Sequence, residues 1–359
     1  MKTIIALVCL LSGAALSAQQ TAQMGGIDWQ LEGTVIQENY KGKECLKTNE
    51  GAAVARGIDF GNGILEFSMC IQPGRGFAGI RFHGEDGVNF EEFYVRTHQS
   101  GNPDAMQYTP VYNGNAGWQL YYGDGYSAAT SHAFDTWFPV RLVIAGSRGE
   151  VYIGSMEEPV LCIHELKLGK RGGAIVLNGP ARFADVRITP LEAPELKGSF
   201  KTIERAGEEV IQEYLVSELF DAESLMKESR ISGDFLRKLQ FETFQTEADG
   251  LLNLSRRGAL GEGKNAVLLK INVHADSALI KRMDVGFSDV ARVYVNGKVI
   301  WQGTDTYGSR DYRFLGTLGY FDSVFLDLNR GDNEILILVA ENFGGWGFKA
   351  RFENLLNIH

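Results

Sequence analysis

Short runs in which apolar and polar residues alternate dominate the chain from residue 27 to residue 190. Segments 63–71, 77–83 and 137–144 each place apolar side chains on one face and polar ones on the other, which is typical of half-buried strands. Gly, Asn and Asp separate these runs, and long helical periods are missing there. The pattern predicts an all-β sandwich over residues 19–193.

A change of composition separates this region from the rest of the chain. Residues 191–202 contain proline, glycine and charged residues without an apolar period, which indicates a linker, placed at residues 194–203. A second domain is then expected over residues 204–359. Residues 204–230 are the one stretch where we expect a helix, with Asp221 capping residues 222–227.

Two hairpins are predicted in this second domain. Asn296 and Gly297 supply the positive φ angles of a two-residue turn between the apolar runs 291–295 and 298–301. Residues 323–328 and 334–341 are expected to pair in the same way across the turn 329–333. The fold class predicted for the whole chain is therefore all-β, with two β-sandwich (jelly-roll) domains in tandem.

The first 18 residues have the layout of a secretory signal peptide. Lys2 precedes an apolar run from Ile4 to Leu16, and Ala18 is the small residue after which cleavage is expected. No later run reaches the roughly 18 consecutive apolar residues that a membrane-spanning helix requires. The mature protein is therefore expected to be secreted or periplasmic, without a membrane span.

Composition and charge narrow the classes of function. Hydrophobic residues make up 44% of the chain and charged residues 22%, which excludes a disordered chain. The net charge of −10 disfavours nucleic acid as a partner. Beyond the leader, Cys45, Cys70 and Cys162 show no CxxC spacing, so we expect buried thiols rather than a metal or redox motif. No cofactor is expected, although the Asp- and Asn-rich turns could hold a structural calcium ion.

The order of segments resembles a known superfamily. GILEFSMCI, GFAGIRFHG, FEEFYVRTHQSGNPDAMQYTPVYNG and WFPVRLVIAGSRGEVYI follow one another over residues 27–190. They resemble the concanavalin A-like lectin/glucanase superfamily, in the LamG-like branch related to proteins labelled 3-keto-disaccharide hydrolase. The second half, from VYVNGKVIW to NFGGWGF, is similar to galactose-binding-like sandwiches. The resemblance implies carbohydrate recognition or processing, but the E-x-D-x-x-E motif of the glucanase branch is absent.

Strand parity predicts a polar binding face in the first domain. If Phe93 and Val95 point into the core, the even-numbered residues from Glu92 to His98 share the opposite face. The same reasoning applies to segments 77–83 and 137–144, on the assumption that these strands are neighbours. The alternative is an ordinary solvated face with ion pairs to Glu92 and Glu85. The predicted binding face comprises Arg81, His83, Tyr94, Arg96, His98 and Arg141.

Aromatic and amide residues intermingle in residues 107–122. Sugars present apolar C–H faces ringed by hydroxyls, so a sugar site needs flat aromatic rings beside hydrogen-bonding groups. Packing in the core is the alternative for such rings. In the second domain, Tyr307 and Trp346 are further candidates, with packing favoured for Trp346. The predicted ligand-binding residues of this segment are Gln107, Tyr108, Trp118 and Tyr121.

Three functions follow from these observations. The favoured one is an exported carbohydrate-binding protein without its own catalysis, in a bacterial glycan-processing system. The second is a glycoside hydrolase or lyase acting on a polysaccharide or disaccharide, with Glu92 and His98 as the acid and base. The third is a structural or adaptor protein of the envelope, whose protein partners the sequence does not identify.

Overall fold

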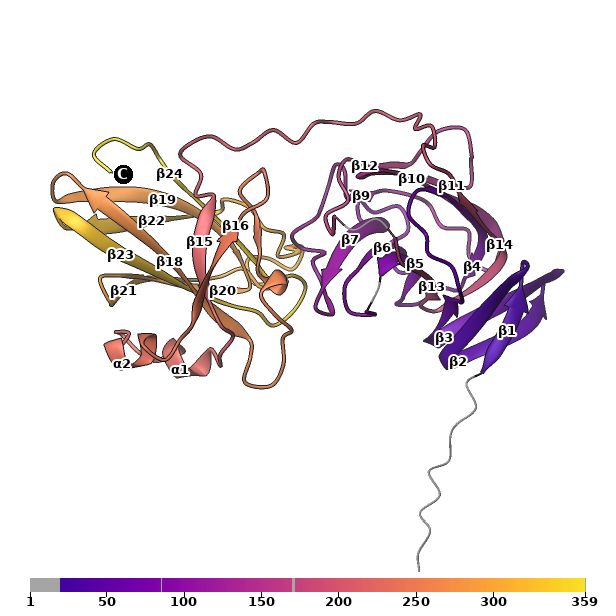
Figure 1. Cartoon of the computed structure of the whole chain (residues 1–359), viewed down its shortest axis with the longest axis horizontal. Helices are drawn as coiled ribbons and strands as arrows, with labels where there is room; N and C mark the ends of the chain where they lie inside the picture. Colours follow the sequence, from indigo (N-terminus) through magenta and orange to yellow (C-terminus); the bar gives the residue numbers. More distant parts are fainter. Residues whose placement is uncertain (1–19, 85, 170–171, 359) are drawn as a thin grey trace, which may run out of the picture.

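The computed structural model contains two β-rich bodies that lie side by side (Figure 1). It describes residues 20–84, 86–169 and 172–358, so the predicted signal peptide and Glu85 lie outside the described residues. We call residues 21–190 the N-terminal sandwich and residues 213–352 the C-terminal sandwich. The predicted all-β fold class is confirmed, because strands form nearly all of the regular structure in both.

Fourteen strands form one continuous, mainly antiparallel sheet in the N-terminal sandwich. Its order is β12-β11-β10-β4-β14-β3-β13-β5-β6-β7-β8, with β2 and then β1 on β3, and β9 on β7. The strands are β1 (Thr21–Met24), β2 (Ile27–Tyr40), β3 (Lys43–Ala55), β4 (Gly63–Ile71), β5 (Phe77–Gly84), β6 (Phe90–Arg96), β7 (Met106–Tyr112), β8 (Asn115–Ala116), β9 (Ser127–Ala128), β10 (Phe138–Ala145), β11 (Arg148–Ile153), β12 (Leu161–Ile163), β13 (Ala174–Asn178) and β14 (Ala181–Pro190).

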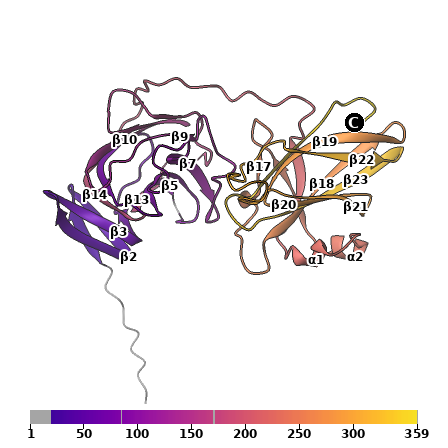
Figure 2. The ribbon, with the colours of Figure 1, turned by 180° about the vertical axis from the view of Figure 1, so that it is seen from behind.

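This sheet folds back on itself around one apolar core. Leu142 of β10 and Phe93 of β6 lie far apart along the strand order, yet both belong to the same buried cluster. Strands β4, β5 and β10 match the three segments in which alternation was clearest. One end of the sheet, with β7 and β9, lies at the boundary with the C-terminal sandwich (Figures 1 and 2).

The C-terminal sandwich consists of two sheets, one of six strands and one of four. Their orders are β16-β15-β18-β23-β20-β21 and β17-β24-β19-β22. The elements are β15 (Glu213–Ser217), α1 (Glu223–Met226), α2 (Gly233–Leu236), β16 (Phe241–Gln245), β17 (Leu252–Asn253), the 3-10 helix η1 (Leu254–Arg256), β18 (Ala266–Ala275), β19 (Leu279–Ser288), β20 (Val290–Val295), β21 (Lys298–Thr304), β22 (Asp322–Leu328), β23 (Gly331–Ala340) and β24 (Gly347–Phe352).

Apolar side chains from both sheets meet between them, among them Ile337 of β23 and Phe348 of β24. A second apolar cluster covers the outer face of the six-stranded sheet, where Leu225 of α1 packs with Leu268 of β18. Figure 1 shows both helices along this side of the sandwich. In the part of the chain that the structure describes, no helix has the length and apolar character to cross a bilayer.

The structure confirms the first predicted hairpin and corrects the second. β20 pairs with β21, and Asn296 and Gly297 in the turn have φ angles of 49° and 78°. By contrast, β22 pairs with β19 whereas β23 pairs with β18 and β20. The chain therefore crosses from one sheet to the other at residues 329–333. The Asn333 side chain shapes this corner, because it accepts from the Asn329 N–H and donates to its carbonyl.

The expected helix is much shorter than the 204–230 window. α1 is a single turn in which Asp221 Oδ1 accepts from the Glu223 N–H, and β15 occupies part of the window. A second short helix, α2, begins after Ser232, whose hydroxyl accepts from the Phe235 N–H. Residues 191–212 contain no helix or extended strand and pass along one side of the molecule (Figure 1). The domain and linker boundaries stay predictions.

The three cysteines among the described residues are free thiols. Cys45 and Cys70 are buried, as expected, whereas Cys162 is half-buried. Burial raises the pKa of all three thiols, so they are poor nucleophiles at neutral pH. Among the described residues, no three His, Cys, Asp or Glu side chains are grouped so that they could hold a metal ion.

Candidate functional site: a pocket between the two sandwiches

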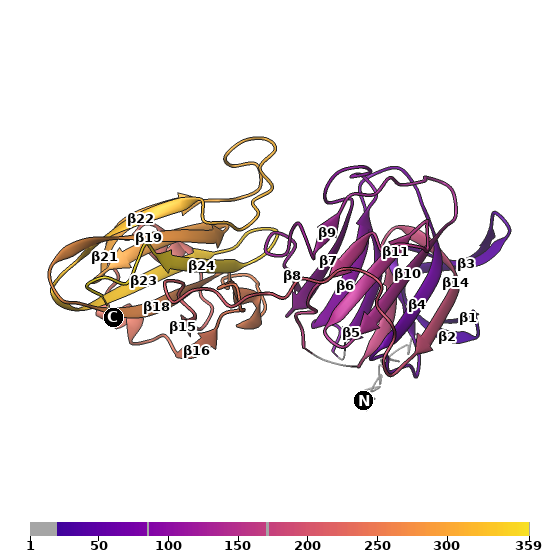
Figure 3. The ribbon, with the colours of Figure 1, turned by 90° about the horizontal axis from the view of Figure 1, so that it is seen from above.

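A cavity of about 410 Å³ lies where the two sandwiches meet. Most of its wall comes from strands β5 and β6 and the turns beside them. The rest comes from β8 and the loop after it and from two loops of the C-terminal sandwich. Figure 3 shows one of these, the loop between β21 and β22, projecting beside the boundary. The lining residues are Arg75, Phe77, Glu92, Tyr94, Arg96, His98, Gln99, Asp104, Ala116 and Trp118 from the N-terminal sandwich and Tyr307, Leu315 and Phe343 from the C-terminal sandwich.

Alternation along β6 directs one set of side chains towards this pocket. Phe93 and Val95 are buried in the core, as parity predicts. Tyr94 and Arg96 line the pocket on the other face. They are nevertheless only 5% and 4% exposed, because the C-terminal sandwich and the loop with Trp118 cover them. The polar face is therefore a pocket wall rather than an open surface.

Arg96 is held rigidly in this wall. Its Nη1 donates to the Asp104 carbonyl at 2.8 Å, and its Nη2 donates to Tyr94 Oη at 3.1 Å and to Gln107 Oε1. The guanidinium carbon lies 5.1 Å from the ring centroid of Tyr94 and 5.6 Å from that of Trp118, within the range of cation–π attraction. A fixed positive charge surrounded by aromatic rings therefore forms one wall of the cavity.

His98 lies beside this cation. Its ring meets Phe77 edge to face with centroids 5.5 Å apart, and its Nδ1 is buried without a hydrogen-bond partner among the described residues. Burial lowers the pKa of His98, and the charges of Arg75 and Arg96 lower it further. The imidazole is therefore neutral at pH 7.

Four aromatic rings border the cavity and leave much of their surface open. Phe77 is 42% exposed, Tyr307 55% and Phe343 53%, and Trp118 is half-buried. The Trp118 ring lies 5.9 Å from Phe343 and 6.5 Å from Tyr307 between centroids, in edge-to-face arrangements. Exposed aromatic surface gathered at a cavity is typical of a ligand site, because a ligand that covers it removes apolar area from water.

Gln119 fixes the loop that carries Trp118 against the C-terminal sandwich. Its Nε2 donates to the Leu315 carbonyl at 2.8 Å, and its Oε1 accepts from Ser288 Oγ at 3.0 Å. Its backbone N–H donates to the Gly344 carbonyl at 3.1 Å. Gln119 is 1% exposed, so these bonds form away from water. They set the position of Trp118 relative to Phe343 and Leu315.

A second buried polar cluster joins the two sandwiches. Lys167 Nζ lies 2.7 Å from Glu247 Oε2, and Tyr121 Oη donates to the other oxygen of Glu247. On the N-terminal side, Tyr108 Oη donates to Glu91 Oε2 at 2.7 Å. Burial opposes the charge on Lys167, but the neighbouring Glu247 holds the pKa of that amine above its usual value. Burial raises the pKa of Glu91 to about 7.

These contacts correct three of the predicted ligand residues. Tyr108 and Tyr121 are fully buried, and their hydroxyls donate hydrogen bonds to Glu91 and Glu247, respectively. Gln107 is also fully buried, and its Nε2 donates a hydrogen bond to the Trp118 carbonyl at 2.8 Å. It therefore positions its neighbours rather than facing a ligand. Composition alone could not separate these residues from Trp118, which does line the pocket.

Three residues of the predicted binding face lie elsewhere. Arg141 on β10 pairs with Glu66 at 2.8 Å, and β10 neighbours β4 and β11 rather than β5 or β6. His83 is fully buried, because its φ of 56° breaks the alternation and its Nε2 lies 2.8 Å from the Gly61 carbonyl. Arg81 is on the expected face of β5, where its Nε donates to Glu92 at 3.2 Å, but it does not line the pocket.

The strand pattern missed the rest of the wall. Phe77 is the first residue of β5, Arg75 lies in the turn before it, and Asp104 lies in the turn before β7. Phe343 lies in the NFGGWGF segment. In the same segment Trp346 is fully buried in the core, as the packing interpretation predicted. An aromatic residue beside glycines was the only sequence signal for Phe343.

Comparisons with known proteins leave the family open. No family model matches the sequence, and no curated protein matches it. Among solved structures, the chain is similar to the carbohydrate binding module CBM66 from Bacillus subtilis, with 16% identity over 46% of this chain and 96% of that one and a TM-score of 0.35. It is also similar to CG-16, a homodimeric agglutinin from chicken liver, with 14% identity, 38% and 99% coverage and a TM-score of 0.30. The function must therefore be argued from the pocket.

Proposed function

We propose that the protein is an exported carbohydrate-binding protein whose ligand occupies the pocket between the sandwiches. The observation that carries this proposal is the set of four partly exposed aromatic rings around a wall of fixed hydrogen-bonding groups. Sugar rings combine apolar C–H faces with hydroxyls, so they complement aromatic faces beside polar atoms. A role in a bacterial glycan-processing system, within the concanavalin A-like superfamily, belongs to the same proposal.

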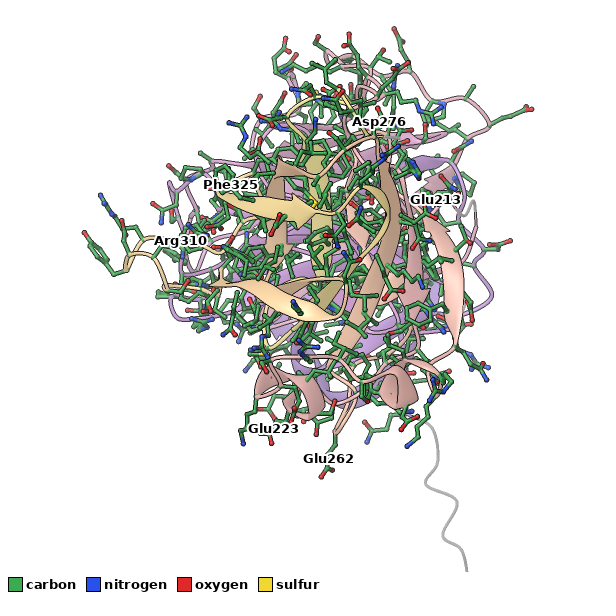
Figure 4. All side chains as sticks on the ribbon, turned by 90° about the vertical axis from the view of Figure 1, so that its left-hand side faces the viewer. Glu213, Glu223, Glu262, Asp276, Arg310 and Phe325 are labelled. Carbon is green, nitrogen blue, oxygen red and sulfur yellow. The ribbon has the colours of Figure 1, made fainter. Side chains whose placement is uncertain are left out.

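The test is a glycan screen with the purified protein, followed by matched variants. Trp118→Ala removes the ring that contacts both Phe343 and Tyr307, and we expect it to weaken sugar binding at least about 30-fold, or about 2 kcal/mol. Phe325→Ala is the control, because Phe325 is 64% exposed on β22 and does not line the pocket. Figure 4 shows Phe325 on the C-terminal sandwich. Equal losses in both variants, or no bound glycan, would contradict the proposal.

A glycosidase or lyase activity is the second candidate, because Glu92 and His98 line the same pocket. Glu92 Oε1 already accepts hydrogen bonds from Arg81 at 3.2 Å and Asn178 at 3.1 Å. The second carboxyl group of the wall belongs to Asp104, which already has Arg96 as a cationic neighbour. Product analysis on every glycan that binds separates the two functions: turnover that is lost in Glu92→Gln would favour the enzyme.

A further inference from the structure

The charges around the pocket are unevenly compensated. Asp104 Oδ2 lies 3.8 Å from Arg96 Nη1, and Glu92 Oε1 lies 3.2 Å from Arg81 Nε, so both carboxylates of the wall have a cationic neighbour within the protein. Arg75 differs from them. It is exposed in the turn between β4 and β5 and forms no hydrogen bond or ion pair with the residues that the structure describes. Arg75 is therefore the charged residue of the wall that has no ion-pair partner among the described residues.

His98 is a second group in this part of the pocket that lacks a partner. Its Nδ1 is buried and unbonded among the described residues, and the ring is held in place by Phe77. Arg75 and Arg96 disfavour a proton on the imidazole, whereas Asp104 and the Gly76 carbonyl favour one more weakly. An anion placed between His98 and Arg75 would reverse this balance, because its negative charge would favour a proton on the imidazole and neutralise the charge of Arg75.

We propose that the ligand is a sugar that carries a carboxylate, such as a uronic acid, and that this carboxylate binds at Arg75 and His98. This inference rests on the proposed function and narrows the class of sugar. A guanidinium fork matches the two oxygens of a carboxylate, and such charge-assisted hydrogen bonds are stronger than neutral ones. The sugar ring would then lie against the exposed faces of Phe77 and Trp118, which border the same cavity.

The geometry implies that binding takes up a proton. In the free protein the pKa of His98 is lowered by burial and by the two arginines. A bound carboxylate raises it, so the complex holds more protons than the separate partners do over the interval between the two pKa values. Affinity for the acidic sugar should therefore increase as the pH falls, by at most about tenfold per pH unit. The pH dependence should vanish when the ligand carboxylate is esterified.

The experiment compares acidic trisaccharides with their methyl esters, which keep the same sugar rings but lose the charge. Calorimetric titration of the full chain with trigalacturonate, a mannuronate trisaccharide and a glucuronate-containing trisaccharide, each against its ester, is made at pH 7.5 and 5.5. At least one acid should bind about tenfold or more tightly than its ester, and more tightly at the lower pH. Arg75→Gln should reduce the acid-to-ester ratio about tenfold, whereas the exposed Arg330→Gln should leave it unchanged.

The outcomes separate this inference from the proposed function. If the esters or neutral glycans of the screen bind as tightly as the acids, and Trp118→Ala abolishes that binding, the pocket binds sugars but the carboxylate inference is wrong. If neither acids nor neutral glycans bind, both proposals fail. His98→Gln supplies an independent readout, because it should remove the pH dependence of acid binding; a slope that persists in this variant would overturn the role given to the imidazole.

Discussion

Trp118 and Phe343, which come from opposite halves of the chain, meet edge to face with their ring centroids 5.9 Å apart. Neither ring belongs to the core of its own sandwich, and each leaves surface open to the cavity. The pocket therefore depends on the interface that holds the two loops together. Four predictions follow from the residues that build this interface and this wall.

Gln119→Ala should destabilise the interface. The change leaves the Leu315 carbonyl and the Ser288 hydroxyl without their buried partner, at a cost of about 1–3 kcal/mol. Denaturant unfolding measures the loss, and limited proteolysis of residues 191–212 reports any separation of the sandwiches. Gln302→Ala on the exposed side of β21 is the matched control and should change little. Equal stability of the two variants would show that Gln119 does not join the halves.

Gly344→Ala should weaken ligand binding. A Cβ at Gly344 would lie 2.3 Å from Gln119 Oε1, and φ there is 111°. The Gln119 side chain and the Trp118 ring, or the loop with Phe343, must therefore shift. We expect an affinity loss of roughly tenfold or more. Gly331→Ala is the control, because its φ of 93° imposes comparable backbone strain while a Cβ there meets nothing within 4 Å. Similar affinities in the two variants would exclude a packing role for Gly344.

Glu91 should make the protein less stable as the pH rises. Its pKa in the folded state is raised to about 7 by burial, so between about pH 4.5 and 7 the folded chain binds more protons than the unfolded chain does. The free energy of unfolding then falls with increasing pH, by up to about 3 kcal/mol from this group. Glu91→Gln should flatten this part of the curve, which denaturant titrations at a series of pH values measure.

The control for Glu91 is Glu262→Gln, since Glu262 is exposed and lies on the surface of the C-terminal sandwich (Figure 4). It should leave the pH dependence of stability unchanged. A wild-type unfolding free energy that rises between pH 5 and 7, with no difference between the two variants, would show that Glu91 is ionised in the folded protein at low pH.

Arg96→Lys should reduce binding although it keeps the charge. An ammonium group cannot reach the Asp104 carbonyl, Tyr94 Oη and Gln107 Oε1 together, as the guanidinium does. We expect a tenfold to hundredfold loss of affinity, measured on the glycan that the screen identifies. Arg313→Lys, at an exposed pair with Asp311, is the matched control. If Arg96→Lys binds as the wild type does, the fixed geometry of the guanidinium is unimportant.

Local patterns predicted the strands and the faces of β6, because the alternation of side chains is set by the backbone of each strand. The same patterns placed Arg141 wrongly, since the order of strands in the sheet depends on contacts distant in the sequence. His83 was misplaced for a related reason: a single positive φ reverses the face of one residue. The second hairpin failed because turn residues are equally suited to a corner between two sheets.

The candidate site was predictable only in part. Tyr94, Arg96, His98 and Trp118 were found because they stand on one predicted face or in a segment rich in aromatic residues. The sequence could not assign Tyr307, Leu315 and Phe343 to this pocket, because their position depends on how the two sandwiches meet. Tyr121 shows the converse: its distant partner Glu247 makes it part of the interface.

Because the walls of the cavity come from two sandwiches, a bound ligand should stabilise the interface between them. A ligand that contacts Trp118 and Phe343 together binds only while the halves keep their mutual orientation, so its binding free energy opposes their separation. The occupied protein should consequently melt in one cooperative transition even where the empty protein melts in two. Either sandwich produced alone should bind the ligand more weakly than the full chain does.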